Sequence, residues 1–149
     1  MKQWPDNALL SGYYEPLTAE CTAQNLVVEG EIPRELNGTF YRNGPNPQFP
    51  PENEYHLFTG DGMIHAIEFS DGRARYRNRF IQNDGFKLEQ EHGDWLYKGM
   101  NSLMDPTPSP IPEGAPSAKN LANTALTYHN NTLYALHEPS QPTVIELGS

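Results

Sequence analysis

The sequence predicts an all-β protein, and three observations lead to that prediction. First, 14 prolines and 12 glycines in 149 residues interrupt the chain too often for long helices. Second, Asp71-Gly72 and Asn130-Asn131 read as two-residue hairpin turns between strand-like segments. Third, the two hairpins lie roughly 55 residues apart, close to the ~40–50 residues of a β-propeller blade. We therefore expect stacked antiparallel sheets and no helices.

Composition narrows the class of protein. A formal net charge of −9 argues against nucleic acid as a partner, because phosphate binding needs a basic face. The single cysteine, Cys21, excludes an internal disulfide framework and a multi-cysteine zinc site. No apolar run has the length of a signal peptide or of a transmembrane helix. We expect a cytoplasmic protein, and the sequence leaves a peripheral membrane contact open.

The Asp71-Gly72 turn sets the register of the first hairpin, in which Phe69 pairs with Ala74 and Glu68 with Arg75. One face then carries Met63, Ile67, Phe69, Tyr76 and Phe80, and the other carries Glu68, Arg75, Arg77 and Arg79. This segregation supports the register, because the residues of one face alternate along a strand. The arginines indicate a solvated salt-bridge row, with Glu68 opposite Arg75, rather than a nucleic-acid patch.

The second hairpin predicts Tyr128 opposite Leu133 and Asn123 opposite Glu138, with apolar residues on both faces. Further strands are expected at 25–28, at 38–43 and from 143 onward. The remaining segments are irregular: an arm at 1–23, a proline-rich loop at 43–53 and a covering or crossing loop at 101–120.

A polar row is expected beside the Thr59–Gly62 turn. If that turn is a four-residue hairpin loop, His56 opposes His65, and Asn78 joins the same row. Two opposed imidazoles could share a metal, but no third ligand follows at a fitting position. We therefore expect His56, His65 and Asn78 to form a buried polar row in which the members satisfy one another, without a metal.

Glu138 has two interpretations on residue grounds alone. It follows a strand covered on both sides and precedes Pro139, so a buried carboxylate there would need a strong donor. The alternative is an exposed glutamate at a strand end, which is the more common situation for this residue type. Gly60-Asp61-Gly62 is interpreted as a turn rather than a calcium loop, because the alternating acidic ligands are missing.

The length of the chain limits the propeller prediction. A span of 149 residues provides two to three blades, whereas closure needs at least about four. Exposed strand edges would remain, and we expect them to drive self-association of the isolated chain. The sequence thus indicates a portion of something larger.

Four segments carry a resemblance to a known family: GEIPRELNGTFYRNGPNPQ, HLFTGDGMIHAIEFSDGRARYRNRF, KNLANTAL and LYALHEPSQP. In this order and spacing, from Glu20 to Leu147, they resemble the N-terminal part of the carotenoid cleavage oxygenases, a family with retinal-pigment and lignostilbene-type members. Thr59 departs from the pattern, since many members have Asp there.

The resemblance implies one seven-bladed β-propeller domain, of which 1–149 would be the N-terminal portion: an arm at 1–23, then propeller strands and loops at 24–149. It implies a non-haem Fe(II) held by four histidines, all expected beyond Ser149, with O2 cleaving a carbon–carbon double bond of a carotenoid, apocarotenoid or stilbene. Glu138 matches a glutamate that hydrogen-bonds to an iron-ligating histidine. His56 and His65 match positions that are not iron ligands, so this span holds no catalytic residue or metal, and we expect it to be inactive alone.

Two rival functions stay open on the sequence. The chain could be a catalytically inactive β-sheet module that binds a ligand or partner, with its strand edges covered by self-association. Alternatively, His56 and His65 could be half of a metal site that a second chain completes.

Overall fold

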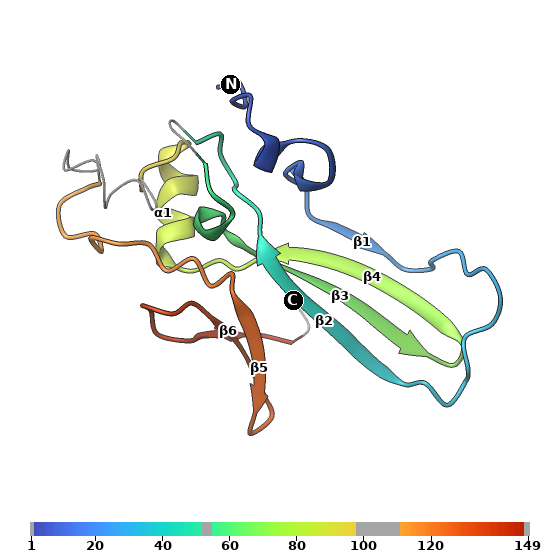
Figure 1. Cartoon of the computed structure of the whole chain (residues 1–149). Helices are drawn as coiled ribbons and strands as arrows, with labels where there is room; N and C mark the ends of the chain where they lie inside the picture. Colours follow the sequence, from blue (N-terminus) through green and yellow to red (C-terminus); the bar gives the residue numbers. More distant parts are fainter. Residues whose placement is uncertain (1, 52–54, 98–110, 148–149) are drawn as a thin grey trace.

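Two antiparallel sheets and one short helix make up the fold. A computed structural model of the chain describes residues 2–51, 55–97 and 111–147. The chain forms the four-stranded sheet first, then helix α1 (Asp84–His92), and then the three-stranded sheet (Figure 1). No helix among the described residues is long and apolar enough to cross a membrane.

The four-stranded sheet has the order β1-β4-β3-β2. Its strands are β1 (Cys21–Ala23), β2 (Gly38–Pro45), β3 (Gly62–Ser70) and β4 (Arg73–Phe80). The predicted register of the β3–β4 hairpin is confirmed: Phe69 pairs with Ala74 and Glu68 with Arg75, and the same register continues to Met63 with Phe80. Asp71 and Gly72 both have positive φ, of 47° and 70°, as a type I′ turn requires.

The three-stranded sheet has the order β5-β6-β7. Its strands are β5 (Ala125–His129), β6 (Thr132–Leu136) and β7 (Thr143–Ile145). The predicted pairing of Tyr128 with Leu133 is confirmed. The paired ladder ends at Ala125 opposite Leu136, so the expected pairing of Asn123 with Glu138 lies just beyond it.

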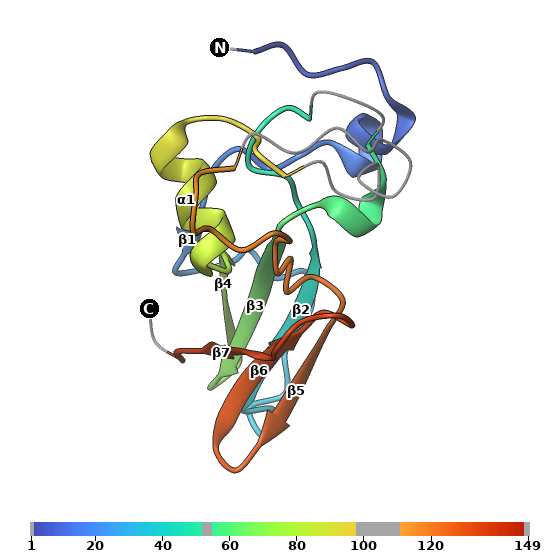
Figure 2. The same cartoon turned by 90° about the vertical axis from the view of Figure 1, so that its left-hand side faces the viewer.

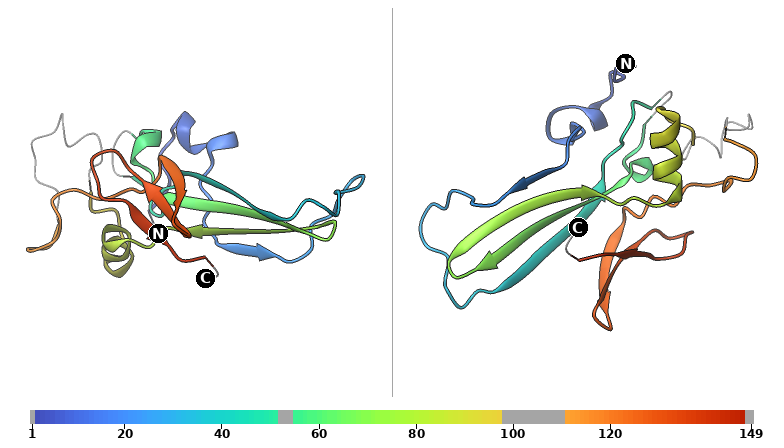
Figure 3. Two further views of the ribbon diagram at one scale, coloured as in Figure 1. Left: turned by 90° about the horizontal axis from the view of Figure 1, so that it is seen from below. Right: turned by 180° about the vertical axis from the view of Figure 1, so that it is seen from behind.

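The sheets meet at one end, where a small apolar core forms. Its buried members are Ile64, Ile81, Ala122 and Ala135, with Tyr41, Leu126 and Ile145 packed around them. Ile64 lies on the same face of the first sheet as Glu68 and Arg75. Sheet β5-β6-β7 thus packs against the end of this face that carries Ile64 (Figure 2). The pair Glu68–Arg75 lies farther along the same face, toward the β3–β4 turn. The β3–β4 turn extends away from this core and from α1 (Figure 3).

Two sequence predictions about the elements are wrong. The strand expected at 25–28 is absent, and β1 lies earlier, inside the predicted arm, because Cys21 to Ala23 pair with β4. The arm also contains two 3₁₀ turns, Ala8–Leu10 and Gly12–Tyr14.

A helix was also missed. Asn83 caps α1 by accepting from Phe86 N at 3.0 Å, and Gly93 ends it in the left-handed region at φ 77°. These two end signals are present in the sequence, but the helix between them has a weakly apolar face.

Candidate functional site

Two of the sequence segments that carry the family resemblance contact a third one, at its residues 119–124. Gly62 N donates to Leu121 O at 2.8 Å, and Asn43 Nδ2 donates to Ala122 O at 2.7 Å. A Cβ atom on Gly62 would lie 2.5 Å from Ala122 O, so only glycine allows this approach. The NGPNP strand end, the GDG turn and the 119–124 segment are therefore one hydrogen-bonded unit.

Asn123 joins this unit to the turn before β3. Its side chain is buried, and Nδ2 donates to Phe58 O at 3.1 Å and to Gly60 O at 2.7 Å. The bond to Gly60 O is buried and the bond to Phe58 O is partly buried, and a buried carbonyl without a donor is costly. Asn123 thus holds the chain in place immediately before Thr124.

Thr124 and Glu138 meet where strand β5 begins and strand β6 ends. Thr124 Oγ1 donates to Glu138 Oε2 at 2.9 Å, and Thr124 N donates to Leu136 O at 3.0 Å. The Glu138 backbone N–H and then the Thr124 hydroxyl lower the pKa of the Glu138 carboxyl, since both stabilise its ionised form. Glu138 is exposed in the described chain, so its carboxylate lies at the surface, with one oxygen held by the Thr124 hydroxyl.

His137 lies beside this carboxylate and is partly buried. Its Nδ1 lies 3.0 Å from Ser140 Oγ and 3.5 Å from Leu121 N, both of which can donate to it. Burial lowers the pKa of His137, while Glu138 acts in the opposite sense. These contacts describe an imidazole that stays neutral near pH 7.

A buried cluster of charged side chains is linked to the same unit. Lys119 Nζ contacts Asp61 Oδ1 and lies 2.5 Å from Glu89 Oε2, and all three side chains are at most 6% exposed. The stem of Lys119 lies over Gly85 of α1, where a Cβ atom would be 2.7 Å from Lys119 Cγ. The cluster therefore ties the GDG turn and α1 to the start of the 119–124 segment.

Sequence reasoning missed this cluster. Asp61 was assigned only to a turn, and Glu89 stood in a polar stretch where α1 was not expected. Lys119 carried one signal, as the single cation that opens the KNLANTAL segment.

The predicted row of His56, His65 and Asn78 exists only in part. His65 pairs with Asn78, as expected, and Asn78 is buried and donates to Ala19 O at 3.3 Å. The pairing of His56 with His65 is wrong, because β2 places Arg42 opposite His65.

His56 itself has a different role in the structure. It is exposed and caps the 3₁₀ turn Leu57–Thr59, accepting from Phe58 N at 3.1 Å. The Thr59–Gly62 segment is this 3₁₀ turn followed by the start of β3, and not a hairpin loop.

His65 has a hydroxyl partner instead of a second imidazole. Its Nδ1 lies 2.7 Å from Tyr76 Oη. Burial, and then the positive charge of Arg42, lower the pKa of His65. Within the described ranges, no group of three or more His, Cys, Asp or Glu side chains could hold a metal.

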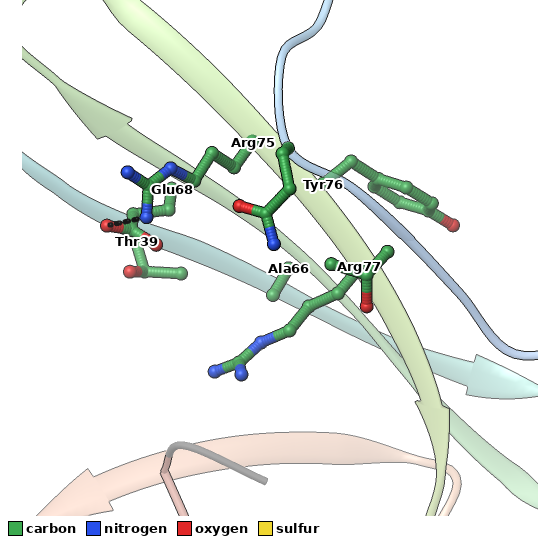
Figure 4. A pocket seen from close by; sticks show the side chains of 8 residues that line it. Thr39, Ala66, Glu68, Arg75, Tyr76 and Arg77 are labelled. Atoms are coloured by element: carbon green, nitrogen blue, oxygen red, sulfur yellow. Dashed lines mark ion pairs between the residues drawn. The ribbon is translucent and has the colours of Figure 1, made fainter.

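The arginine face is hollowed but ion-paired. A hollow of about 150 Å³ is lined by Thr22, Gln24, Thr39, Ala66, Glu68, Arg75, Tyr76 and Arg77 (Figure 4). Arg75 Nη1 lies 3.9 Å from Glu68 Oε1, which confirms the predicted cross-strand pair. Arg79 donates to Cys21 O at 3.0 Å and to Thr22 Oγ1 at 2.9 Å. Arg75 and Arg79 thus bond to an exposed carboxylate and to atoms of the sheet.

The antiparallel hairpin sheets, packed at one end with polar residues at their strand ends, define part of a β-propeller. The family described as retinal pigment epithelial membrane protein matches residues 14–149. The chain belongs to this family, the carotenoid oxygenases.

Relatives that are named for different substrates match more than nine tenths of this chain. Lignostilbene-alpha,beta-dioxygenase isozyme III of Sphingomonas paucimobilis is 35% identical over 98% of this chain and 29% of the relative. The probable carotenoid cleavage dioxygenase 4 of Arabidopsis thaliana is 33% identical over 93% of this chain and 26% of the relative. Resveratrol cleavage oxygenase 1 of Aspergillus fumigatus is 35% identical over 96% of this chain and 28% of the relative.

Solved structures agree with these matches. A lignostilbene dioxygenase of Pseudomonas brassicacearum superposes with a TM-score of 0.86, at 29% identity, over 100% of this chain and 30% of that one. A cobalt-substituted apocarotenoid oxygenase of Synechocystis gives a TM-score of 0.72, at 32% identity, over 88% and 28%. The chain thus spans less than a third of the length of these relatives.

Proposed function

We propose that this chain is the N-terminal portion of a non-haem Fe(II) dioxygenase that cleaves a carbon–carbon double bond of a carotenoid, apocarotenoid or stilbene. The observation that carries the proposal is the 33–35% identity, over 93–98% of the chain, to relatives named as dioxygenases of carotenoids and lignostilbene. The reaction consumes one O2 per double bond, and each former alkene carbon receives one oxygen atom and becomes a carbonyl.

Residues 1–149 belong, in this proposal, to a single propeller domain that continues beyond the described sheets. The proposed iron, held by four histidines beyond Ser149, would supply the activation of O2 when bound. A metal centre in the complete protein is supported by the cobalt-substituted relative. In this proposal the chain contributes framework strands and one polar group, the Glu138 carboxylate, rather than iron ligands.

Glu138 is the residue of this chain that we place nearest the chemistry. Its carboxylate would accept a hydrogen bond from the distal ring nitrogen of a metal-binding histidine, which fixes the imidazole and raises its basicity. The Thr124 hydroxyl already holds one oxygen of that carboxylate, at 2.9 Å. The lowered pKa of Glu138 keeps the acceptor ionised at neutral pH.

The test uses the protein encoded by the complete reading frame that contains this chain, loaded with Fe(II). It is incubated under O2 with a hydroxystilbene, an apocarotenal and a carotenoid in detergent micelles. We expect two carbonyl products from at least one substrate, with label from ¹⁸O2 in both. A folded, iron-loaded protein that cleaves none of the three substrate classes would overturn the proposal.

A matched pair of variants tests the role of Glu138. We expect Glu138→Gln to weaken Fe(II) affinity by about 10–100-fold, because a neutral amide is a poorer partner for the ligating imidazole. Glu68→Gln makes the same change on an exposed carboxylate far along the sheet and should leave affinity unchanged. Equal Fe(II) affinities of the two variants would show that Glu138 does not bond to a metal-binding histidine.

The isolated chain tests whether the proposed iron ligands lie outside this span. We predict that purified 1–149 forms no cleavage product, because none of the proposed iron ligands is in this span. Iron-dependent product formation by 1–149 would contradict that prediction.

A further inference from the structure

The buried cluster of Asp61, Glu89 and Lys119 has an uneven charge balance. Two carboxyl groups share one ammonium group, and their side chains are only 5%, 2% and 6% exposed. With both carboxylates ionised, the cluster would hold one uncompensated negative charge away from water. Such a charge is expensive, and buried groups shift their protonation to avoid it.

The hydrogen bonds show which carboxyl group is the better-stabilised anion. Glu89 accepts from four donors: Leu96 N at 3.0 Å, Tyr97 N at 3.2 Å, Lys119 Nζ at 2.5 Å and Gln48 Nε2 at 3.4 Å. Among the described residues, the Asp61 carboxyl accepts from two donors, Gln48 N at 3.1 Å and Lys119 Nζ. Each additional donor favours the charged form.

Among the described residues, the other titratable groups that face the cluster supply no compensating charge. Tyr55 and Tyr97 are both buried. Burial, and then an ionised Asp61, raise the pKa of Tyr55. Burial and then Glu89 raise the pKa of Tyr97, whose hydroxyl has no partner in the described part of the chain. Both phenols therefore stay neutral, and within residues 2–51, 55–97 and 111–147 Lys119 is the one cation in contact with the two carboxyl groups.

We propose that the cluster holds an extra proton on Asp61, so that the folded protein near neutral pH contains a neutral Asp61, an ionised Glu89 and an ionised Lys119. The two charged side chains then compensate each other. This inference rests on the packing alone and is independent of the proposed oxygenase function.

The direction of the pKa shifts agrees with this assignment. Burial raises the pKa of Asp61, more than Lys119 lowers it. Burial lowers the pKa of Lys119, but the two carboxyl groups outweigh that effect and raise it.

The linkage has a definite sign. Because the pKa of Asp61 is higher in the folded than in the unfolded chain, its contribution to stability is complete below the unfolded value of about 3.9. That contribution is lost as pH rises toward the folded pKa. The buried cluster, which joins the GDG turn to α1, therefore stabilises the folded protein less as the pH rises.

Asp61→Asn in the full-length protein tests the proposal, because asparagine mimics the shape of the neutral acid. The measurement is the unfolding equilibrium constant of the parent relative to the variant, from denaturant titrations at several pH values between 4.5 and 8. The expected ratio rises about tenfold per pH unit until the folded pKa is reached, since one proton is linked. A ratio that is flat, or that falls as pH rises, would overturn the proposal.

Asp71→Asn is the matched control, with the same chemical change on an aspartate whose side chain is 73% exposed. Its ratio should not rise with pH over this range, because an exposed carboxylate keeps its contact with water in the folded protein. If Asp61→Asn does not fold, ¹³C-carboxyl labelling of aspartate in the parent decides the question by NMR. A carboxyl resonance at the protonated position at pH 7 supports the proposal, and its absence overturns it.

Discussion

Thr124 Oγ1 donates a hydrogen bond of 2.9 Å to Glu138 Oε2, linking two residues that are 14 positions apart in the sequence. The bond joins the residue that precedes β5 to the residue two positions after β6. It depends on the hairpin register, and it sets the orientation of the carboxylate that we place beside the metal.

Thr124→Val tests what this bond does to Glu138. The variant removes the hydroxyl and keeps the branched shape, so the pKa of Glu138 should rise part of the way toward its ordinary value. The shift is partial because the first cause of the lowering, the Glu138 backbone N–H, remains. An NMR titration of the Glu138 side chain measures the change.

Thr124→Ser keeps the donor and is the control, with an unchanged Glu138 pKa. Because that pKa is lowered on folding, the stability it contributes is present above the unfolded value and is lost as pH falls through the folded value. Thr124→Val should reduce this acid dependence. Identical titrations of the valine and serine variants would show that the hydroxyl has no electrostatic effect.

Asn123→Ala should destabilise the protein by about 1–3 kcal/mol, because two carbonyl oxygens lose their donor and one of those bonds is buried. The acceptors are Phe58 O and Gly60 O. Asn37→Ala is a matched control, since Asn37 Nδ2 also donates to two carbonyls, but in an exposed turn where water replaces it. Denaturant unfolding compares the two, and equal losses would contradict the structural role of Asn123.

The hairpins could be predicted from sequence because their signals are local. A two-residue turn with positive φ sets the register, and alternation then assigns each face. The pairs from Met63 with Phe80 to Phe69 with Ala74 followed from the Asp71-Gly72 turn alone. By contrast, β1 is a strand because it pairs with β4, some 55 residues later in the chain, and no local pattern contains that information.

The site could be predicted only where the family resemblance reached it. Glu138 was singled out by its match to a family position, and its place beside a metal stays a prediction. The hydroxyl of Thr124, which donates to Glu138, was not singled out, since a hydroxyl carries no pattern of its own. The Asp61–Lys119–Glu89 cluster escaped prediction for a related reason. Its members come from three segments and are charged residues, which sequence reasoning assigns to the surface.

Gly62→Ala should cost about 1–3 kcal/mol or more, because the new methyl group would meet backbone atoms that cannot move aside easily. An added Cβ lies 2.5 Å from Ala122 O and 2.9 Å from Ile81 Cδ1. Gly44→Ala is the control on the neighbouring strand, where no atom lies within 4 Å of the added Cβ. Thermal unfolding of both variants gives the comparison, and a stable Gly62→Ala protein would contradict the close approach.

Two ion pairs in this chain should differ greatly in their effect on stability. Lys119→Met leaves Glu89 buried without its counter-ion, and breaking such a pair typically costs about 3–5 kcal/mol. Arg75→Met breaks the exposed pair with Glu68 and should cost less than about 1 kcal/mol. Denaturant unfolding at neutral pH measures both losses, and similar values would show that Lys119 is not buried as the structure places it.

The isolated chain should self-associate through its open strand edges. Sheet β5-β6-β7 leaves β7 unpaired on one side, and Val144 in its centre is 59% exposed. Unpaired backbone groups beside an exposed apolar residue are a template for pairing with another copy. Sedimentation of 1–149 should therefore show mass that increases with concentration, and Val144→Lys should reduce it because an edge charge opposes pairing. Val27→Lys changes an exposed valine outside any strand and should have no such effect, while a monomer at every concentration would contradict the prediction.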